Sequence, residues 1–216
     1  MGFVIANHRH PVSCHGMDFR LALLAWGSQP MEEPGLLVVG QGKAMFSLPP
    51  EGHPLKRMDA QNRNFRLLAM QADWAVQLGE GLARIDPWLR LTYSSQTLSR
   101  YLSAEGQDRQ ALAVLADGTP AACMTVRPNW LRGPLLELLA VLPGYQGCGL
   151  GRDMLAWLVG QAQRDKQGNL WTISSEFNQS ARAFYRQQGF EEVGNLPDLI
   201  LAQEVEILLR LRINQA

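Results

Sequence analysis

The sequence predicts an α/β domain in which a mixed central sheet of about six to seven strands is flanked by about four helices, with an N-terminal extension before it. Two observations carry this prediction. From about residue 63, strand-like and helix-like segments alternate regularly, and a glycine-rich loop at 141–151 joins an apolar strand to a helix that is itself followed by a strand. With 216 residues, the chain is long enough to bury a core without a metal or a disulfide.

Residues 1–60 differ from the rest of the chain. They are rich in proline and glycine, contain all four histidines, and offer only two strand-like pieces, at 19–26 and 35–48. We therefore expect an extension over 1–60 and the domain over 61–216. On this reading, a chain that begins at Met58 is expected to fold.

The first regular segments are a strand and two helices. The strand is expected at 65–70, and the first helix at 71–83. The second helix begins at Ser94, a candidate N-cap, and ends near Gly106. Apolar residues at helical spacing predict the buried faces of the two helices: Trp74, Val76, Leu78 and Leu82 in the first, and Leu98, Tyr101 and Leu102 in the second.

A hairpin and a βαβ unit follow. The turn sequence ADGTP joins two strands between residues 110 and 130, and a third strand at 135–141 leads into the glycine-rich loop. The helix after the loop extends to near Gly168, and a strand at 169–175 completes the unit. The buried face of this helix is expected to hold Met154, Leu155, Leu158, Val159 and Ala162. The chain continues with a short helix at 179–188, stopped at Gly189, and with strands at 190–196 and 204–213.

Composition excludes several classes of partner. Lys plus Arg and Asp plus Glu both number 20, and no basic block is present, so we expect no nucleic-acid partner. The apolar runs are too short to span a bilayer, and the first residues lack the apolar region of a signal peptide, so we expect no membrane association. Three widely spaced cysteines suit a reducing compartment, and we expect a cytoplasmic protein: Cys14, Cys123 and Cys148.

One cluster near the N-terminus has the donor types that zinc prefers. His8, His10, Cys14 and His15 all lie within eight residues beside a proline. Zinc sites usually combine ligand pairs from two distant segments, so the spacing does not favour a metal site. We expect no metal cofactor.

The glycine-rich loop is typical of a phosphate site, because glycines expose backbone N–H groups next to the positive end of a helix. A Walker loop would need Gly-Lys-Ser/Thr, but Arg152 and Asp153 follow Gly151. A Rossmann fingerprint needs Gly-x-Gly-x-x-Gly and is not matched, although Glu176 stands where a ribose-binding acid could. The pattern Gln/Arg-x-x-Gly-x-Gly/Ala is matched by Gln146, Gly149 and Gly151.

With this third pattern the chain resembles the GNAT superfamily of N-acetyltransferases over about residues 63–212. A second signature, NQSARAFYRQQGF at 178–190, stands about 30 residues beyond the loop in the expected order. Two departures concern the loop: Cys148 occupies a position that is frequently basic in the family, and Gln146 replaces the commoner arginine. Pyrophosphate affinity would then depend on backbone amides and on Arg152.

The resemblance implies transfer of an acetyl group from acetyl-CoA to a primary amine, by direct attack of the amine on the thioester. The backbone of the strand end at 139–141 would polarise the thioester carbonyl. Asn178 would contact the CoA arm, with the role of helix N-cap as the alternative or additional reading. The residues implied in cofactor binding are Leu139, Ala140, Val141, Gln146, Gly147, Cys148, Gly149, Leu150, Gly151, Arg152 and Asn178.

The resemblance also implies catalytic roles. Tyr185 matches the position that protonates the departing thiolate. Because the domain contains no histidine, the base must be a carboxylate or a water chain. Glu137 is the best candidate, since it interrupts an apolar strand and strand alternation places it on the face of Leu139 and Val141; the alternative is a salt bridge to Arg127.

Residues Asp86 and Trp88 fall where the family shapes its acceptor pocket, or else serve as an N-cap and a core anchor. We expect the acceptor to be a small-molecule or peptide amine, and a homodimer is compatible with these features. The alternative function is a non-catalytic acyl-CoA-binding sensor or scaffold. Thiol release with an amine would distinguish the two.

Overall fold

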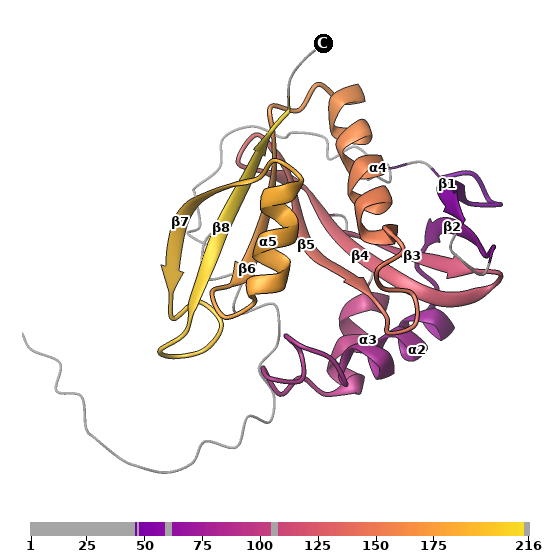
Figure 1. Ribbon diagram of the computed structural model, residues 1–216, viewed down its shortest axis with the longest axis horizontal. Helices are drawn as coiled ribbons and strands as arrows, with labels where there is room; N and C mark the ends of the chain where they lie inside the picture. The colour runs from indigo at the N-terminus through magenta and orange to yellow at the C-terminus, as the bar shows by residue number, and fades with distance from the viewer. Residues whose placement is uncertain (1–45, 47, 59–61, 105–107, 214–216) are drawn as a thin grey trace, which may run out of the picture. The chain divides into compact units, whose positions relative to one another are not determined.

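The computed structural model describes residues 46, 48–58, 62–104 and 108–213, and these form an eight-stranded mixed sheet with four helices (Figure 1). They belong to one compact unit that spans Leu37–Ala216. The α/β class predicted from the sequence is confirmed. The candidate zinc donors and the strand-like piece at 19–26 lie outside the described residues.

The strands lie in the order β1-β2-β3-β4-β5-β6-β8-β7. All neighbours are antiparallel except β5 and β6, which are parallel because a helix crossover connects them. The strand bounds are β1 His53–Met58, β2 Asn64–Ala69, β3 Gln110–Ala116, β4 Thr119–Trp130, β5 Gly133–Val141, β6 Asn169–Ser175, β7 Glu191–Pro197 and β8 Val205–Arg212.

Two helices, α2 (Ala72–Leu82) and α3 (Ser95–Ser103), follow β2. The Ser94 hydroxyl caps α3 by accepting a hydrogen bond from the Thr97 amide at 3.1 Å, as expected from the sequence. Helix α3 ends at Ser103, before the end expected near residue 106. Val76 was expected on the buried face of α2 but is 50% exposed. The reason is that Leu78 and Leu82 define the buried stripe, and Val76 lies about 200° around the helix from Leu78.

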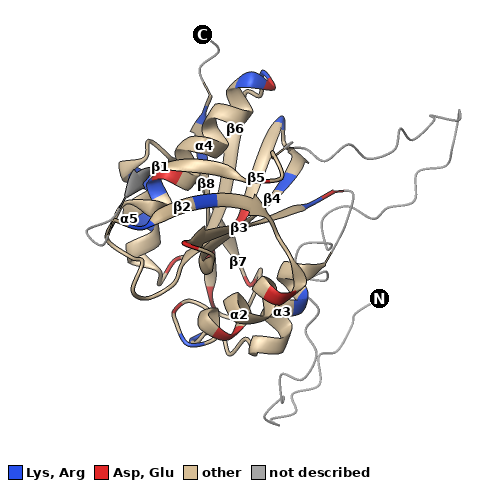
Figure 2. Cartoon of the chain, turned by 90° about the vertical axis from the view of Figure 1, so that its right-hand side faces the viewer, with Lys and Arg blue, Asp and Glu red and all other residues tan. Residues whose placement is uncertain are grey.

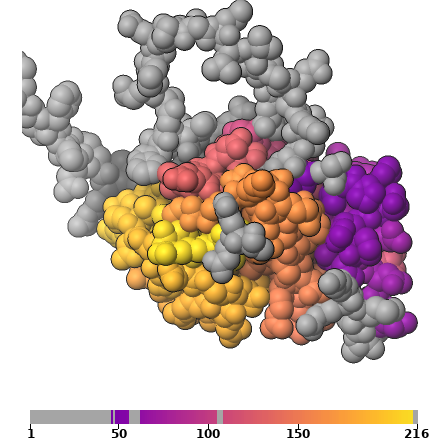
Figure 3. Space-filling model, turned by 90° about the horizontal axis from the view of Figure 1, so that it is seen from above, coloured from indigo at the N-terminus to yellow at the C-terminus, as the bar shows by residue number. Residues whose placement is uncertain are grey.

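Helices α4 (Leu150–Arg164) and α5 (Gln179–Gln187) follow the glycine-rich loop and β6. Helix α4 ends at Arg164, before the end expected near residue 168, and Val159 is only partly buried beside its core face. Figure 3 shows the orange atoms of α4 between the indigo atoms of β1 and β2 and the yellow atoms of the C-terminal strands. Gly189, with φ of +87°, follows the end of α5 as the sequence predicted.

The two helix pairs cover opposite faces of the sheet. Successive strand residues point to opposite faces, and in β4 Met124 and Val126 join the core under α4 while Thr125 contacts Tyr101 of α3. Helices α4 and α5 therefore lie on one face, and α2 and α3 on the other (Figure 1). The centre of the sheet is thus covered by a different pair of helices on each face.

The sheet begins earlier than the sequence indicated. Strand β1 precedes the boundary expected at residue 61 and pairs antiparallel with β2. Phe46 is 2% exposed, packs edge-on against Trp157 of α4 at 5.1 Å between ring centroids, and exchanges backbone hydrogen bonds with the Gln110 side chain. Part of the segment assigned to the extension therefore belongs to the core.

Candidate active site

The parallel strands β5 and β6 separate shortly after they meet. Their register pairs are Leu135 with Trp171 and Leu136 with Thr172, and no pair follows. At the same point β5 carries a bulge: Thr125 pairs with Leu138 and Val126 with Leu136, so that Glu137 has no opposite residue. A bulge bends its strand and increases the local twist. The bulge therefore directs the second half of β5 away from β6.

The backbone beyond the bulge points into the gap at alternate residues. The Leu142 amide donates to the Ala121 carbonyl of β4 at 2.9 Å. In an antiparallel ladder, residues two apart direct their backbone groups the same way. Ala140 therefore faces β4, whereas the N–H groups of Leu139 and Val141 face the gap. Of the three residues expected to polarise a carbonyl, these two have amides in a position to do so.

Glu137 does not lie on the face that strand alternation predicted. Leu139 and Val141 pack against the core under α4, whereas Glu137 contacts α3 on the opposite face. The bulge is the reason, because it places both Glu137 and Leu138 between Leu136 and Leu139 and so shifts the alternation by one residue.

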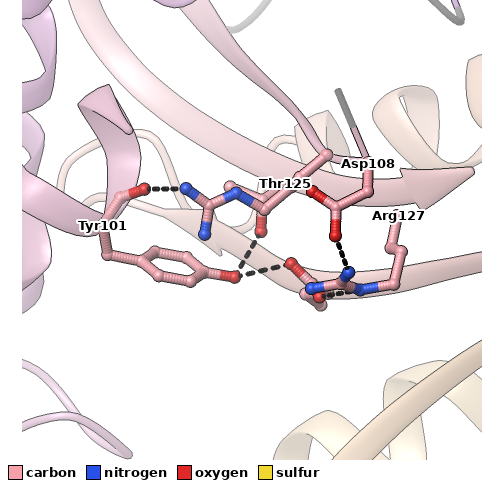
Figure 4. Close-up of polar contacts among 6 residues, drawn as sticks. Tyr101, Asp108, Thr125 and Arg127 are labelled. Atoms are coloured by element: carbon pink, nitrogen blue, oxygen red, sulfur yellow. Dashed lines mark hydrogen bonds and ion pairs between the residues drawn. The ribbon is translucent and has the colours of Figure 1, made fainter. Parts of the chain in front are cut away.

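Both carboxylate oxygens of Glu137 accept hydrogen bonds. They belong to a polar cluster in which Figure 4 labels Tyr101, Thr125, Arg127 and Asp108. Oε1 accepts from Arg127 Nε at 2.8 Å, which is the salt bridge weighed in the sequence analysis, and Oε2 accepts from the Tyr101 hydroxyl at 3.0 Å. The Tyr101 hydroxyl also lies 2.9 Å from Thr125 Oγ1, and Arg127 bonds Asp108 as well. Burial, with a smaller contribution from the Glu137 charge, raises the pKa of Tyr101 well above its ordinary value.

The loop between β5 and α4 has the geometry of an anion site. Gly147 and Gly149 adopt φ of +77° and +88°, a region that favours glycine, and Gly149 caps α4 without a side-chain hydrogen bond. The first amides of α4 thus face outward at the positive end of the helix, an arrangement that fits a pyrophosphate. Gln146 donates from Nε2 to the Val141 carbonyl at 2.8 Å, and Cys148 contacts the Tyr145 carbonyl. Arg152 is exposed on the first turn of α4.

Tyr185 lies on the α4 and α5 face of the sheet, next to Thr172, where β5 and β6 separate. Its side chain is buried and packs against Phe190, with ring centroids 5.3 Å apart. Burial raises the pKa of Tyr185 to about 12, and a hydrogen bond with Thr172, a residue of the last β5–β6 pair, partly opposes this. Asn178 is the N-cap of α5 and accepts from the Ala181 amide at 3.1 Å, which confirms the N-cap reading.

The connection between α2 and α3 covers the opposite face. Asp86 is exposed there and Trp88 is partly buried. Arg90 ties this connection to the C-terminal strands, because it pairs with Glu204 at 3.2 Å and lies 3.9 Å over the ring of Phe177. Asp86 and Trp88 therefore lie on a segment that is fixed to the neighbourhood of β8.

One buried carboxyl group in this neighbourhood, that of Glu206, was not predicted from the sequence. Glu206 of β8 is 2% exposed and pairs with Ser175 of β6. Its signal in the sequence was the same as that of Glu137, an acidic residue within an apolar strand. Burial raises the pKa of Glu206 to about 7, and the nearby Glu204 charge contributes, whereas a hydrogen bond with Ser175 lowers it.

The described part shows no segregation of charge and no metal-binding group. In Figure 2 basic and acidic residues are interspersed over the visible face. Within the described residues, no three His, Cys, Asp or Glu side chains come together in a metal-binding group. None of the helices described there combines the length and the apolar character needed to cross a bilayer.

Comparison with known proteins identifies the family. The acetyltransferase (GNAT) family model matches residues 73–190. The ribosomal protein bS18-alanine N-acetyltransferase of Haemophilus influenzae is 33% identical over 114 residues, which cover 53% of this chain and 71% of that protein. The streptothricin acetyltransferase of Streptomyces lavendulae is 34% identical over 95 residues, 42% of this chain and 50% of that protein.

A solved structure shows the same fold. The ribosomal-protein-S18-alanine N-acetyltransferase of Escherichia coli superposes with a TM-score of 0.56 at 22% identity, over 70% of this chain and 96% of that one. The family match spans the strand gap, the amide-lined loop and both sequence signatures. This chain therefore belongs to the GNAT family of acetyltransferases.

Proposed function

We propose that this protein transfers an acetyl group from acetyl-CoA to a primary amine by direct attack on the thioester. The observation that carries the proposal is the gap between β5 and β6, which lies between an amide-lined loop and the Tyr185 hydroxyl. The gap joins the two faces of the sheet. Cofactor and acceptor can therefore meet in it from opposite sides without a covalent enzyme intermediate.

Acetyl-CoA would be held mainly by backbone groups. The amides of residues 147–152 would bind the pyrophosphate, with Arg152 as the added charge. The side chain of Gln146 would act indirectly, because it holds the loop to Val141. Asn178 would contact the CoA arm through the part of its amide not used in capping. Bound acetyl-CoA supplies the activated acetyl group.

The chain's own groups would assist each stage of the transfer. The Leu139 and Val141 amides would donate to the carbonyl oxygen as it gains negative charge. Tyr185 would donate its proton to the departing thiolate, and its raised pKa keeps that proton in place at neutral pH. Glu137 would hold Tyr101 and Arg127 in the wall of the acceptor side.

The acceptor is proposed to be a primary amine, free or at the N-terminus of a peptide. One relative is named as a ribosomal-protein alanine N-acetyltransferase and another as a streptothricin acetyltransferase. The names of these relatives thus include both a protein acceptor and a small-molecule acceptor. The connection at 83–94, fixed by Arg90, would line the acceptor side.

A thiol-release screen tests the proposal. Purified full chain is incubated with acetyl-CoA and a panel of small amines, polyamines, aminoglycosides, streptothricin, amino acids and peptides that begin with alanine. We expect at least one amine to release thiol well above the rate without acceptor, and mass spectrometry to find an equal amount of acetylated amine. Tight CoA binding without acceptor-dependent thiol release from any member would refute the proposal and favour the acyl-CoA sensor.

A further inference from the structure

The carboxyl group of Glu206 is buried without full hydrogen-bonding. Its side chain lies on β8 with 2% exposure, and the oxygen Oε1 has no hydrogen-bond partner within the described residues. Burying an ionisable group without satisfying it is costly, and such groups concentrate at functional sites. An unpartnered oxygen of this kind can take up a proton without the loss of a hydrogen bond within the described residues.

Glu206 lies on the acceptor face. Ile207 and Leu209 point into the core under α4, so Glu206, between Val205 and Ile207, points to the face of α2 and α3. It is opposite Ser175, three residues beyond the last β6 residue that pairs with β5. The Glu206 side chain is thus on the α2 and α3 face, beyond the point where β5 and β6 separate, whereas Tyr185 is on the opposite face.

The connection between α2 and α3 approaches Glu206 from above. The pKa of Tyr93 is raised mainly by burial and secondly by the charge of Glu206. The two side chains are therefore near each other. Charged groups in this neighbourhood are Glu204, which directly precedes β8, and Glu176, whose amide donates to the Val205 carbonyl. Arg90 from the connection also reaches this neighbourhood through Glu204. Arg90 is paired with Glu204 and stacked on Phe177. The contacts of Arg90 are thus with Glu204 and Phe177, and the charge that acts on the pKa of Glu206 is that of Glu204.

The other acidic candidate is already engaged. Glu137 accepts from Arg127 and from Tyr101 at hydrogen-bond distance, one bond to each oxygen. Protonation would remove the charge on which its ion pair with Arg127 depends. Glu206 would give up no hydrogen bond at Oε1 within the described residues.

We propose that Glu206 is the general base that takes the proton from the acceptor's ammonium group, within the proposed acetyl transfer. One N–H bond of the ammonium breaks and the proton passes to Oε1 of the Glu206 carboxylate. The freed nitrogen lone pair forms the bond to the carbonyl carbon, and the C–S bond breaks with its electrons on sulfur. Tyr185 protonates that sulfur, a second N–H bond of the attacking nitrogen breaks to leave the neutral amide, and its proton passes through water to the Tyr185 phenolate. Glu206 then releases its own proton to water, so the net reaction yields amide, free thiol and one proton.

A group that titrates to about 7 is suited to this role near neutral pH, since it combines a substantial anionic fraction with a useful affinity for protons. The role therefore predicts a measurable limb in the pH profile. With the parent chain, kcat/KM should rise with pH through about 7 on the acidic side.

The test compares Glu206→Gln with Glu137→Gln and Glu204→Gln on an amine that the parent acetylates. We expect Glu206→Gln to lower kcat by about a hundredfold or more and to abolish the acidic limb, with acetyl-CoA affinity changed less than about threefold. Glu137→Gln should keep the limb. Glu204→Gln should move the limb to lower pH, because it removes a charge that raises the pKa of Glu206.

Three outcomes would contradict the proposal. A Glu206→Gln variant that keeps turnover within about threefold of the parent and keeps the acidic limb has another base. If Glu206→Gln loses turnover together with melting temperature or CoA affinity, and the acidic limb remains, the role of Glu206 is structural. Loss of the limb in Glu137→Gln instead would assign the base to Glu137.

A titration of the parent chain tests the same group without mutation or turnover. Carbon-13 NMR of glutamate-labelled protein, with Glu206→Gln used only to assign the signal, should show a Glu206 carboxyl midpoint near 7. A midpoint below about 5, the ordinary range, would overturn the proposal. Absence of thiol release with every amine would instead refute the proposed function, so the two failures are distinguishable.

Discussion

Replacing Arg127 by methionine tests whether the ion pair with Glu137 is a structural requirement of the site. Methionine keeps much of the side-chain length and removes the charge. Glu137 has 2% of its side chain exposed, so the change leaves a buried carboxylate with only the Tyr101 hydrogen bond. Removing one partner of a buried pair is far more destabilising than removing both.

The magnitude follows from the contact itself. At 2.8 Å and an effective dielectric constant of about 20, the attraction between the two charges is about 6 kcal/mol. Desolvation of the carboxylate offsets part of this, and the Arg127 side chain is 24% exposed, which adds solvent screening. We therefore expect Arg127→Met to lower the free energy of unfolding by about 3 kcal/mol.

The assay is urea denaturation at pH 7 of the parent, Arg127→Met, Glu137→Gln and the double variant. The double variant should recover about 2 kcal/mol relative to the sum of the single changes, because it leaves no unpaired buried charge. Asp108→Asn is the matched control: its side chain is 71% exposed, and about 0.5 kcal/mol or less is expected. A loss below about 1 kcal/mol in Arg127→Met, with no coupling in the double variant, would refute the reasoning.

Four further predictions follow from the site and its surroundings. Tyr185→Phe keeps the ring packing and removes only the hydroxyl, so CoA affinity and melting temperature should change little. Turnover should fall about ten- to a thousandfold. Turnover equal to that of the parent would show that another group protonates the thiolate. Gly149→Val should weaken acetyl-CoA binding by about 2 kcal/mol or more in calorimetry, because Gly149 has φ of +88° beside the exposed amides. The control is Gly118→Val, at φ of +90° in a remote turn, which should lower stability and leave CoA affinity unchanged. The pKa of Glu206 is about 7 in the folded chain and 4.5 ordinarily, so folding favours the protonated form of this carboxyl group. As the pH rises from about 4.5 to 7, the parent should therefore lose about 1–3 kcal/mol of stability relative to Glu206→Gln. A stability difference that does not change with pH would contradict this. A chain that begins at residue 37 should keep the stability of the full chain. A chain that begins at Met58 lacks Phe46 and most of β1 and should melt at a lower temperature. Equal melting temperatures for these two chains would place the domain boundary near residue 61.

Local patterns predicted most of the elements correctly. The helix that begins at Ser94, the turn at 117–118 and the stop at Gly189 each depend on a residue whose preference is decided by its own backbone. The crossover from β5 through α4 to β6 follows from hydrophobic periodicity together with the loop glycines. Strand β1 was missed because its six residues include a proline and give no clear alternation; pairing with β2 forms it.

Spacing along the chain was enough to predict the class of fold, the family and the glycine-rich turn before α4, because each depends on residues that are close in sequence. Only the tertiary structure decided how the acidic residues of the site are used. A bulge that becomes visible only when β4 and β5 pair turns Glu137 to Arg127 and Tyr101, and the pairing of β8 with β6 brings Glu206 to the face covered by Tyr93. The physical reason is that the direction and the protonation of a carboxyl group depend on neighbours from other strands, and no local pattern specifies those neighbours.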